Sequence, residues 1–90
     1  MYLAKVYVTL KPTVNDPQGL AVKGGLKSLG FPGVESVRIG KYMEITLTAK
    51  DADDAGAQVR QMCQKLLANT VIELYRFELE ELAGEPVRAR

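Results

Sequence analysis

The sequence predicts an α+β domain, because two kinds of pattern recur along one short chain. Apolar and polar residues alternate in several stretches, which is typical of half-buried strands. Between these stretches, apolar residues recur at helical spacing behind a capping residue. The chain has 90 residues, of which 47% are hydrophobic. Its length is too small for two domains, and its composition is typical of a globular domain with one core.

The alternating stretches define the predicted strands, which are residues 2–10, 34–39, 43–49 and 71–79. A turn at Gly40-Lys41 joins the middle two into a hairpin. If both apolar sets face the core, Ile39 pairs with Met43, and Arg38 lies opposite Glu44 on the other face. The sequence therefore predicts an ion pair between Arg38 and Glu44. It leaves the type of the hairpin turn open.

The first predicted helix, residues 17–29, has clear signals at both ends. Asp16 is a capping residue, and Pro17 suits the first helical position because its missing N–H costs nothing there. Gly30 supplies the stop. The apolar stripe expected to face the core is Val22, Leu26 and Leu29. Gly24-Gly25 is unusual, since two glycines inside a helix cost about 2 kcal/mol relative to alanine.

The second predicted helix, residues 51–68, begins behind Asp51, with Asp53 and Asp54 near the positive end of the helix dipole. These three acids are typical of a solvated first turn rather than of a metal site. The apolar stripe of this helix is Ala55, Val59, Met62, Cys63 and Leu66. Cys63 is therefore expected to be a buried thiol that packs in the core.

The predicted element order is strand, helix, strand, strand, helix, strand, the βαββαβ arrangement of ferredoxin-like domains. We expect a four-stranded antiparallel sheet with both helices on one face. Residues 1–82 form this single domain, and residues 83–90 are expected to be a flexible tail. The opposite face would carry Leu3, Lys5, Tyr7, Thr9, Arg38, Glu44, Thr46, Thr48, Ile72, Leu74 and Arg76. Because several of these are apolar, we expect this face, or a strand edge beside it, to mediate self-association.

Charge and composition disfavour several classes of function. Twelve Lys and Arg against eleven Asp and Glu leave a net charge of +1, without the basic surplus typical of nucleic-acid binding. The chain has no histidine, which removes imidazole-based catalysis and histidine metal ligands. The glycines do not match a nucleotide-binding motif. No apolar run approaches the length of a membrane span, and no signal peptide is evident, so a cytoplasmic protein is expected.

Four segments have a distinctive residue order: LKPTVNDPQGLAV (10–22), LGF (29–31), VRIGKYMEI (37–45) and NTVIELYRFELEEL (69–82). Together they resemble the PurS family, the small subunits of formylglycinamide ribonucleotide amidotransferase, also called phosphoribosylformylglycinamidine (FGAM) synthase. The DPQG segment followed by Val-Arg-x-Gly-Lys is the most specific part of the resemblance.

The resemblance implies a non-catalytic subunit of an assembly for purine biosynthesis. In that family, a large synthetase subunit uses ATP, and Mg²⁺ is expected with it. A glutaminase subunit releases ammonia from glutamine, and the small subunit joins the two and supports ammonia transfer. The resemblance further implies a homodimer or homotetramer. The balanced charge and the lack of a long apolar run predict no nucleic-acid or membrane partner, and no cofactor is expected on this chain. No catalytic or metal-binding residue is expected in this chain.

The residues predicted to contact partners are Lys11, Asp16, Gln18, Gly19, Arg38, Lys41 and Glu44. Several of them also have a structural explanation. Asp16 is a helix cap, Gly19 permits close packing, and Arg38 with Glu44 would fix the hairpin register. Gln18 and Lys41 have no such explanation.

Two other functions of the same topology remain open. A regulatory domain would bind a small ligand, such as an amino acid, at a dimer interface, with the loop of residues 13–16 as its pocket. A thermal shift with amino acids or nucleotides in the absence of partners would favour it. A small phosphatase would need an anion-binding arginine in the first loop, and residues 11–16 contain none.

Overall fold

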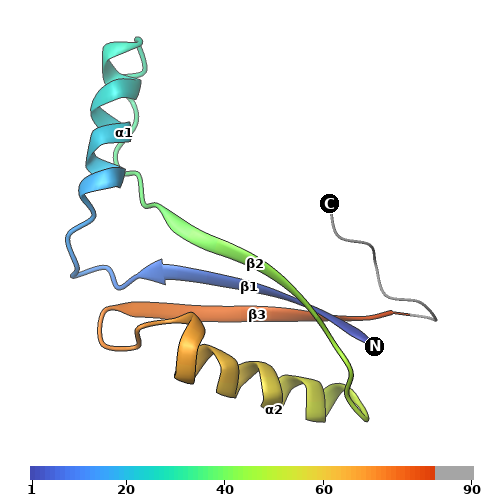
Figure 1. The fold of residues 1–90 in the computed structure, drawn as a ribbon. Coiled ribbons are helices and arrows are strands. Elements are labelled where there is room, and N and C mark those ends of the chain that lie inside the picture. The colour runs from blue at the N-terminus through green and yellow to red at the C-terminus, as the bar shows by residue number, and fades with distance from the viewer. Residues whose placement is uncertain (83–90) are drawn as a thin grey trace.

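The computed structural model describes residues 1–82, and the predicted tail of residues 83–90 lies outside the described residues. The α+β class is confirmed (Figure 1). The elements in chain order are β1 (Tyr2–Leu10), α1 (Pro17–Ser28), β2 (Gly40–Leu47), α2 (Ala52–Met62), the π-helical turn η1 (Cys63–Leu67) and β3 (Glu73–Glu81). None of the helices in this range is long and apolar enough to cross a membrane.

The sheet is antiparallel, and β1 lies at its centre between β2 and β3. Val6 pairs with Met43 on one side and with Phe77 on the other. The strict alternation of β1 sets this register, because Tyr2, Ala4, Val6 and Val8 must all lie on the buried face. Within residues 1–82 the sheet has three strands, so the predicted fourth strand is wrong.

The strand that fails to form is residues 34–39, which run as irregular chain into β2. The backbone N–H of Ile39 donates to the Asp16 carboxylate instead of to a neighbouring strand. The predicted turn at Gly40-Lys41 belongs to β2 itself, where Gly40 pairs with Thr9 of β1. The hairpin that would set Arg38 opposite Glu44 is therefore absent from the described chain, and the predicted pairing across it is wrong. Glu44 lies opposite Lys5 of β1.

The core lies between the sheet and α2, which packs over β1 and β3. Ala55, Val59 and Cys63 of the predicted stripe are fully buried. The expectation of a core thiol at Cys63 is thus confirmed, and burial raises the pKa of this thiol. Asp51 is confirmed as the cap of α2, since its carboxylate accepts a hydrogen bond from the Asp54 N–H at 2.8 Å.

The end of the second helix departs from the prediction at Leu66, which is 83% exposed. The wider turn of η1 shifts the phase of the helix after Met62, and the Ala68 N–H bonds to the Cys63 carbonyl five residues back. Leu67 consequently packs against the core where an uninterrupted α-helix would place Leu66.

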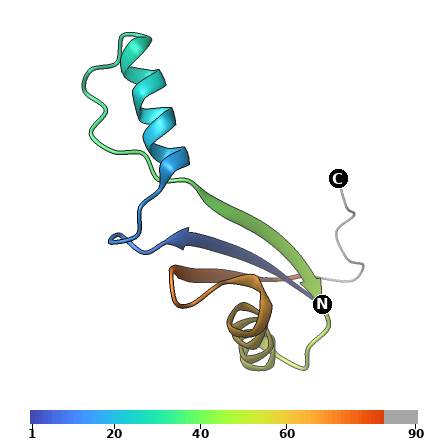
Figure 2. The ribbon, with the colours of Figure 1, turned by 60° about the vertical axis from the view of Figure 1, so that its left-hand side comes forward.

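Helix α1 stands away from the sheet, and Figures 1 and 2 show it projecting from the end of the sheet on the side remote from α2. The prediction that both helices cover one face is therefore wrong. Val22 is 42% exposed and Leu29 is 75% exposed, although both belong to the stripe expected to be buried. The radius of gyration is 16.7 Å, against about 12 Å for a compact chain of this length. We call residues 17–39 the arm.

Candidate interaction site

The base of the arm is organised around a buried carboxylate, Asp16, which is 4% exposed. Its Oδ1 accepts a hydrogen bond from the Gly19 N–H at 2.9 Å, and its Oδ2 accepts one from the Ile39 N–H at 2.8 Å. The hydrogen bond from Ile39 lowers the pKa of Asp16 most, and the one from Gly19 lowers it further, because both stabilise the charged carboxylate. Asp16 therefore caps α1, as predicted, and also ties the helix to the chain that returns from the arm.

Arg38 makes a second connection at the base of the arm. Its Nη2 donates to the Lys11 carbonyl at 3.0 Å and to the Val14 carbonyl at 2.8 Å. The outgoing chain, residues 11–16, and the returning chain, residues 37–40, are thus linked by side chains from both. We call these linked segments the joint. Its hydrogen bonds connect the chain that enters the arm with the chain that leaves it.

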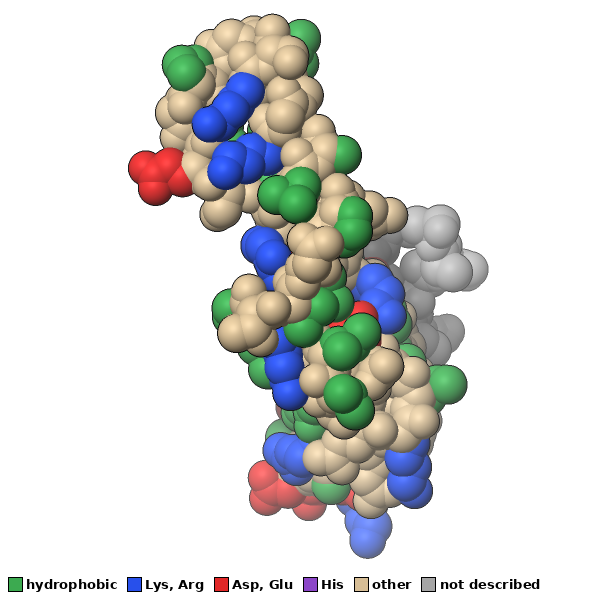
Figure 3. Space-filling view, turned by 90° about the vertical axis from the view of Figure 1, so that its left-hand side faces the viewer, with side chains coloured by type: hydrophobic (Ala, Val, Ile, Leu, Met, Phe, Trp, Pro, Cys, Tyr) green, Lys and Arg blue, Asp and Glu red, His purple; other side chains and the backbone are tan. Residues whose placement is uncertain are grey.

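Two glycines allow the close backbone approaches at the joint. A Cβ at Gly19 would overlap the Val37 carbonyl oxygen, and one at Gly40 would overlap the Val8 carbonyl oxygen. The Gly of the DPQG segment is thus required by packing. Figure 3 shows the narrow connection between the arm and the body, with hydrophobic side chains gathered around it.

A hollow of about 200 Å³ lies between the joint and the face of the sheet that carries α2. We call this hollow the corner. Lys41 and Glu73 lie at its rim, with Lys41 Nζ 3.7 Å from Glu73 Oε2. Its lining residues are Val8, Leu10, Asp16, Gln18, Ile39, Gly40, Lys41 and Glu73. Glu73 was not predicted for the site, and only the register that sets it opposite Leu10 of β1 brings it there.

The structure brings most of the predicted contact residues together, and Glu44 is the exception. The joint and the corner contain Lys11, Asp16, Gln18, Gly19, Arg38 and Lys41. Glu44 lies on the opposite face of the sheet, where its Oε2 accepts a hydrogen bond from the Tyr42 hydroxyl at 2.8 Å. This bond raises the pKa of Tyr42 to about 12.

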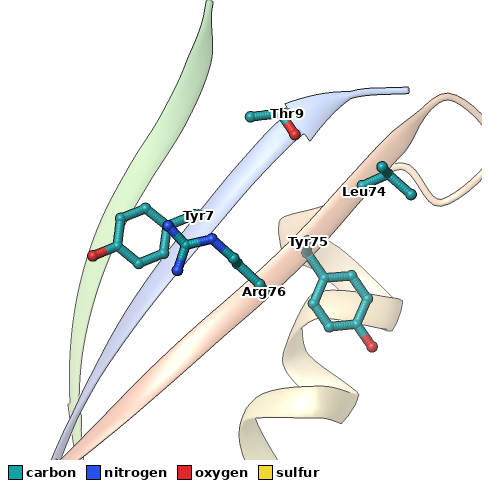
Figure 4. Close-up of a pocket in the computed structure, with 5 residues that line it drawn as sticks. All are labelled: Tyr7, Thr9, Leu74, Tyr75 and Arg76. Atoms are coloured by element: carbon teal, nitrogen blue, oxygen red, sulfur yellow. The ribbon is translucent and has the colours of Figure 1, made fainter. Parts of the chain in front are cut away.

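The face of the sheet opposite α2, which we call the open face, carries an aromatic and cationic cluster. The Arg76 guanidinium carbon lies 3.9 Å from the centroid of the Tyr7 ring, and the Tyr7 and Tyr42 rings are 5.0 Å apart. Figure 4 shows Arg76 extended over Tyr7, whereas Tyr75 points toward α2 on the other side of β3. These neighbours follow from the pairing of Tyr7 with both Tyr42 and Arg76 across the sheet.

The open face mixes polar side chains with apolar ones such as Leu74, which is 48% exposed. Leu3 is buried, Lys5 pairs with Glu80 at 3.6 Å, and Arg76 Nη1 lies 3.2 Å from Glu78 Oε2. Such exposed pairs keep a surface compatible with water and contribute little stability. Within residues 1–82, no group of three or more His, Cys, Asp or Glu side chains is placed to hold a metal ion.

The fold and the site together define an α+β domain with a projecting helical arm, whose most elaborate hydrogen bonding lies at the base of that arm. The family model of PurS, described as phosphoribosylformylglycinamidine (FGAM) synthase, matches residues 3–81. The chain belongs to the PurS family, whose members are subunits of FGAM synthase in purine biosynthesis.

Three relatives illustrate the likeness. The PurS subunit of Bacillus subtilis is 54% identical over 94% of this chain and all of its own length. Its crystal structure superposes with a TM-score of 0.81 at 57% identity, covering 90% of this chain and all of that one. PurS of Methanocaldococcus jannaschii gives a TM-score of 0.82 at 35% identity, over 92% of this chain and all of that one. A chain in the structure of PurLQS from Thermotoga maritima gives 0.76 at 28% identity, over 91% of this chain and 99% of that one.

Proposed function

We propose that this chain is the non-catalytic small subunit that bridges the synthetase and glutaminase subunits of FGAM synthase and supports the transfer of glutamine-derived ammonia. The observation that carries the proposal is the likeness over 91% of the chain to a chain in PurLQS. In this proposal ATP and Mg²⁺ act on the synthetase subunit, and no cofactor binds here. The assembly acts in the cytoplasm, as a set of biosynthetic subunits would.

The geometry supports a role in contact rather than in chemistry. Asp16 and Arg38 use their polar atoms on backbone groups of the joint. Cys63 is buried. By contrast, Gln18 and Lys41 are exposed at the corner, and the cluster of Tyr7, Tyr42 and Arg76 lies on the open face. Aromatic and arginine side chains with polar neighbours are typical of protein interfaces. The corner and the open face are therefore the surfaces we assign to the larger subunits.

Self-association as a homodimer or homotetramer is part of the proposal. It is supported by the extension of the chain, which leaves large apolar side chains of the arm in contact with water. A small domain gains burial when such groups meet another copy. Leu74, which is 48% exposed on the open face, offers further apolar surface to a second copy.

The proposal predicts that omission of this chain affects glutamine-supported turnover and ammonia-supported turnover differently. With all three subunits present, both nitrogen sources should support turnover. Without this chain, glutamine-supported turnover should fall to the level of a mixture lacking glutaminase, whereas turnover with a high concentration of ammonium should persist, because free ammonia needs no transfer. Glutamine-supported turnover that is unaffected by the omission would contradict the proposal.

Lys41→Glu should weaken assembly about tenfold while leaving the fold intact, because it reverses a charge at the rim of the corner. The Lys41 side chain is 57% exposed, so losing its pairing with Glu73 should cost less than about 1 kcal/mol. The measurement is the affinity for the two larger subunits, with unfolding by denaturant as the check on stability. Lys65→Glu, at an exposed position of η1, is the matched control.

A double variant distinguishes contact of Lys41 with the larger subunits from its ion pair with Glu73. Lys41→Glu with Glu73→Lys restores an ion pair in the corner but not the positive charge at residue 41. Assembly should stay weak in the double variant. Full recovery would show that residue 41 matters only through its pairing with Glu73.

A further inference from the structure

Two hollows on the open face meet at Thr9 and Leu74, which line both of them. The first, of about 340 Å³, lies beside Arg76, and Figure 4 shows Thr9, Leu74 and Arg76 on the two strands that form it. The second, of about 440 Å³, reaches Ser36 and Arg38 at the joint. We call the two hollows together the groove. It has an arginine at each end and an exposed leucine between them.

The charge of the groove is positive, since no acidic side chain of residues 1–82 lines either hollow. A guanidinium has five N–H donors. Within residues 1–82, Arg76 has one hydrogen-bond acceptor, Glu78 Oε2, and Arg38 uses its Nη2 for the carbonyls of Lys11 and Val14. Each arginine therefore keeps N–H groups for a further acceptor, and a carboxylate matches the planar geometry of a guanidinium best.

Both arginines are held in place before any partner arrives. The Arg76 guanidinium carbon lies 3.9 Å from the centroid of the Tyr7 ring, and Arg38 is fixed by two hydrogen bonds of 2.8 and 3.0 Å. Ordered side chains lose little conformational entropy when a partner binds. The groove is thus preorganised for carboxylates at its ends, while Leu74 offers an apolar contact in the middle.

The spacing of the two ends matches that of an extended chain. Arg76 lies opposite Tyr7 of β1, and Arg38 bonds to the carbonyl of Lys11, so the groove follows four residues of the chain, about 13 Å. In an extended segment the first, third and fifth side chains lie on one face, and the first and fifth are also about 13 Å apart.

We propose that the groove binds an extended segment of a larger FGAM synthase subunit, with acidic residues at its first and fifth positions and an apolar residue at its third. The carboxylates bind Arg76 and Arg38, and the apolar side chain packs on Leu74. Among residues 1–82 no two acidic residues lie four positions apart, so this part of a second copy contains no such segment. The inference rests on the adaptor function proposed above and specifies the chemistry of the partner.

The first test is a titration of this chain into a mixture of the two larger subunits, with glutamine-supported turnover as the signal. Arg76→Gln should raise the half-saturating concentration about tenfold, because a charged hydrogen bond to the partner is lost, while the maximal turnover is unchanged. Arg60→Gln is the matched control. Arg60 also lies over an aromatic ring, that of Phe77 at 5.9 Å, but it belongs to α2 on the other side of the sheet, so its loss should leave the titration unchanged.

The second test addresses the end of the groove at Arg38 without removing this residue from the joint. Ser36 is exposed in the irregular chain before β2, so substitutions there should leave the fold intact. Ser36→Glu places a carboxylate that competes with the incoming segment for Arg38, and it should weaken binding about tenfold. Ser36→Gln has the same size without the charge and should bind nearly as the wild type does. Circular dichroism and unfolding by denaturant check every variant.

The third test identifies the bound segment by photo-cross-linking. Ser36→Cys is labelled with benzophenone maleimide and irradiated in the assembled mixture, and the cross-linked peptide is read by mass spectrometry. A segment of a larger subunit with two acidic residues four positions apart is expected. Thr46→Cys, near the other end of the open face, is the control and should not label that segment. The native Cys63 is fully buried and should not react with the label.

Several outcomes would overturn the groove as a binding site. They are an unchanged titration for Arg76→Gln or Ser36→Glu, an equal loss for Arg60→Gln, and a cross-link to a second copy or to a segment without the two acids. If glutamine-supported turnover still required the chain, any of these would reject the groove and keep the adaptor function. Turnover that persists without the chain would instead reject the adaptor function itself.

Discussion

Gly19→Ala is expected to destabilise the joint by about 3 kcal/mol, the upper end of the range for overpacking in a closely packed site. The added methyl group would overlap the Val37 carbonyl oxygen and lie 2.7 Å from Asp16 Oδ2. Neither atom can move freely, because Val37 adjoins the residues held by the joint and Asp16 is held by two hydrogen bonds. We expect the amides of Gly19 and Ile39 to lose protection in hydrogen exchange before the sheet does.

Gly24→Ala is the matched control, because it makes the same chemical change in the same helix. Apart from its chain neighbours and the backbone of its own helix, no atom lies within 4 Å of a Cβ at Gly24. Alanine should therefore stabilise α1 by about 1 kcal/mol through its higher helix propensity. Unfolding by denaturant and hydrogen exchange measure both effects. Equal effects of the two substitutions would contradict the close approach at Gly19.

The sequence predicted the elements whose signals are local. Strict alternation placed β1, and the caps Asp16 and Asp51 placed the starts of α1 and α2, where the structure has them. Residues 34–39 misled the prediction because their alternating pattern suits a strand equally well. Their backbone and side chains instead bond to residues 11–16, and no local pattern indicates that a carboxylate distant in sequence will take the Ile39 N–H.

The position of α1 was unpredictable for a related reason. Val22, Leu26 and Leu29 form an apolar stripe whether the surface that covers them belongs to the same chain or to another. Periodicity identifies an apolar side of a helix but not the molecule that it meets. Six of the seven predicted contact residues nevertheless cluster, because the DPQG and Val-Arg-x-Gly-Lys segments meet at the joint and Arg38 also bonds to Lys11. Glu44 was misplaced with the hairpin that did not form.

Asp16→Asn should lower the melting temperature by about 5 to 10 °C at neutral pH, because one of two buried N–H groups loses its acceptor. The carboxylate accepts from both Gly19 and Ile39. An asparagine side chain of the same shape has a single acceptor oxygen, and its NH₂ group would face the other N–H. Asp53→Asn, at an exposed position in the first turn of α2, is the matched control and should change the melting temperature little.

The effect should also depend on pH in a defined direction. The backbone hydrogen bonds from Ile39 and Gly19 lower the pKa of Asp16 in the folded chain below its ordinary value of 3.8. A depressed pKa contributes stability that is fully present above the unfolded pKa and is lost as the pH falls through the folded pKa. The gap in melting temperature between wild type and Asp16→Asn should therefore be constant near neutrality and should narrow below about pH 4. Thermal unfolding between pH 7 and pH 2.5 measures this difference in melting temperature. A difference that is absent at pH 7, or that does not change in acid, would show that a charged Asp16 does not link the two segments of the joint.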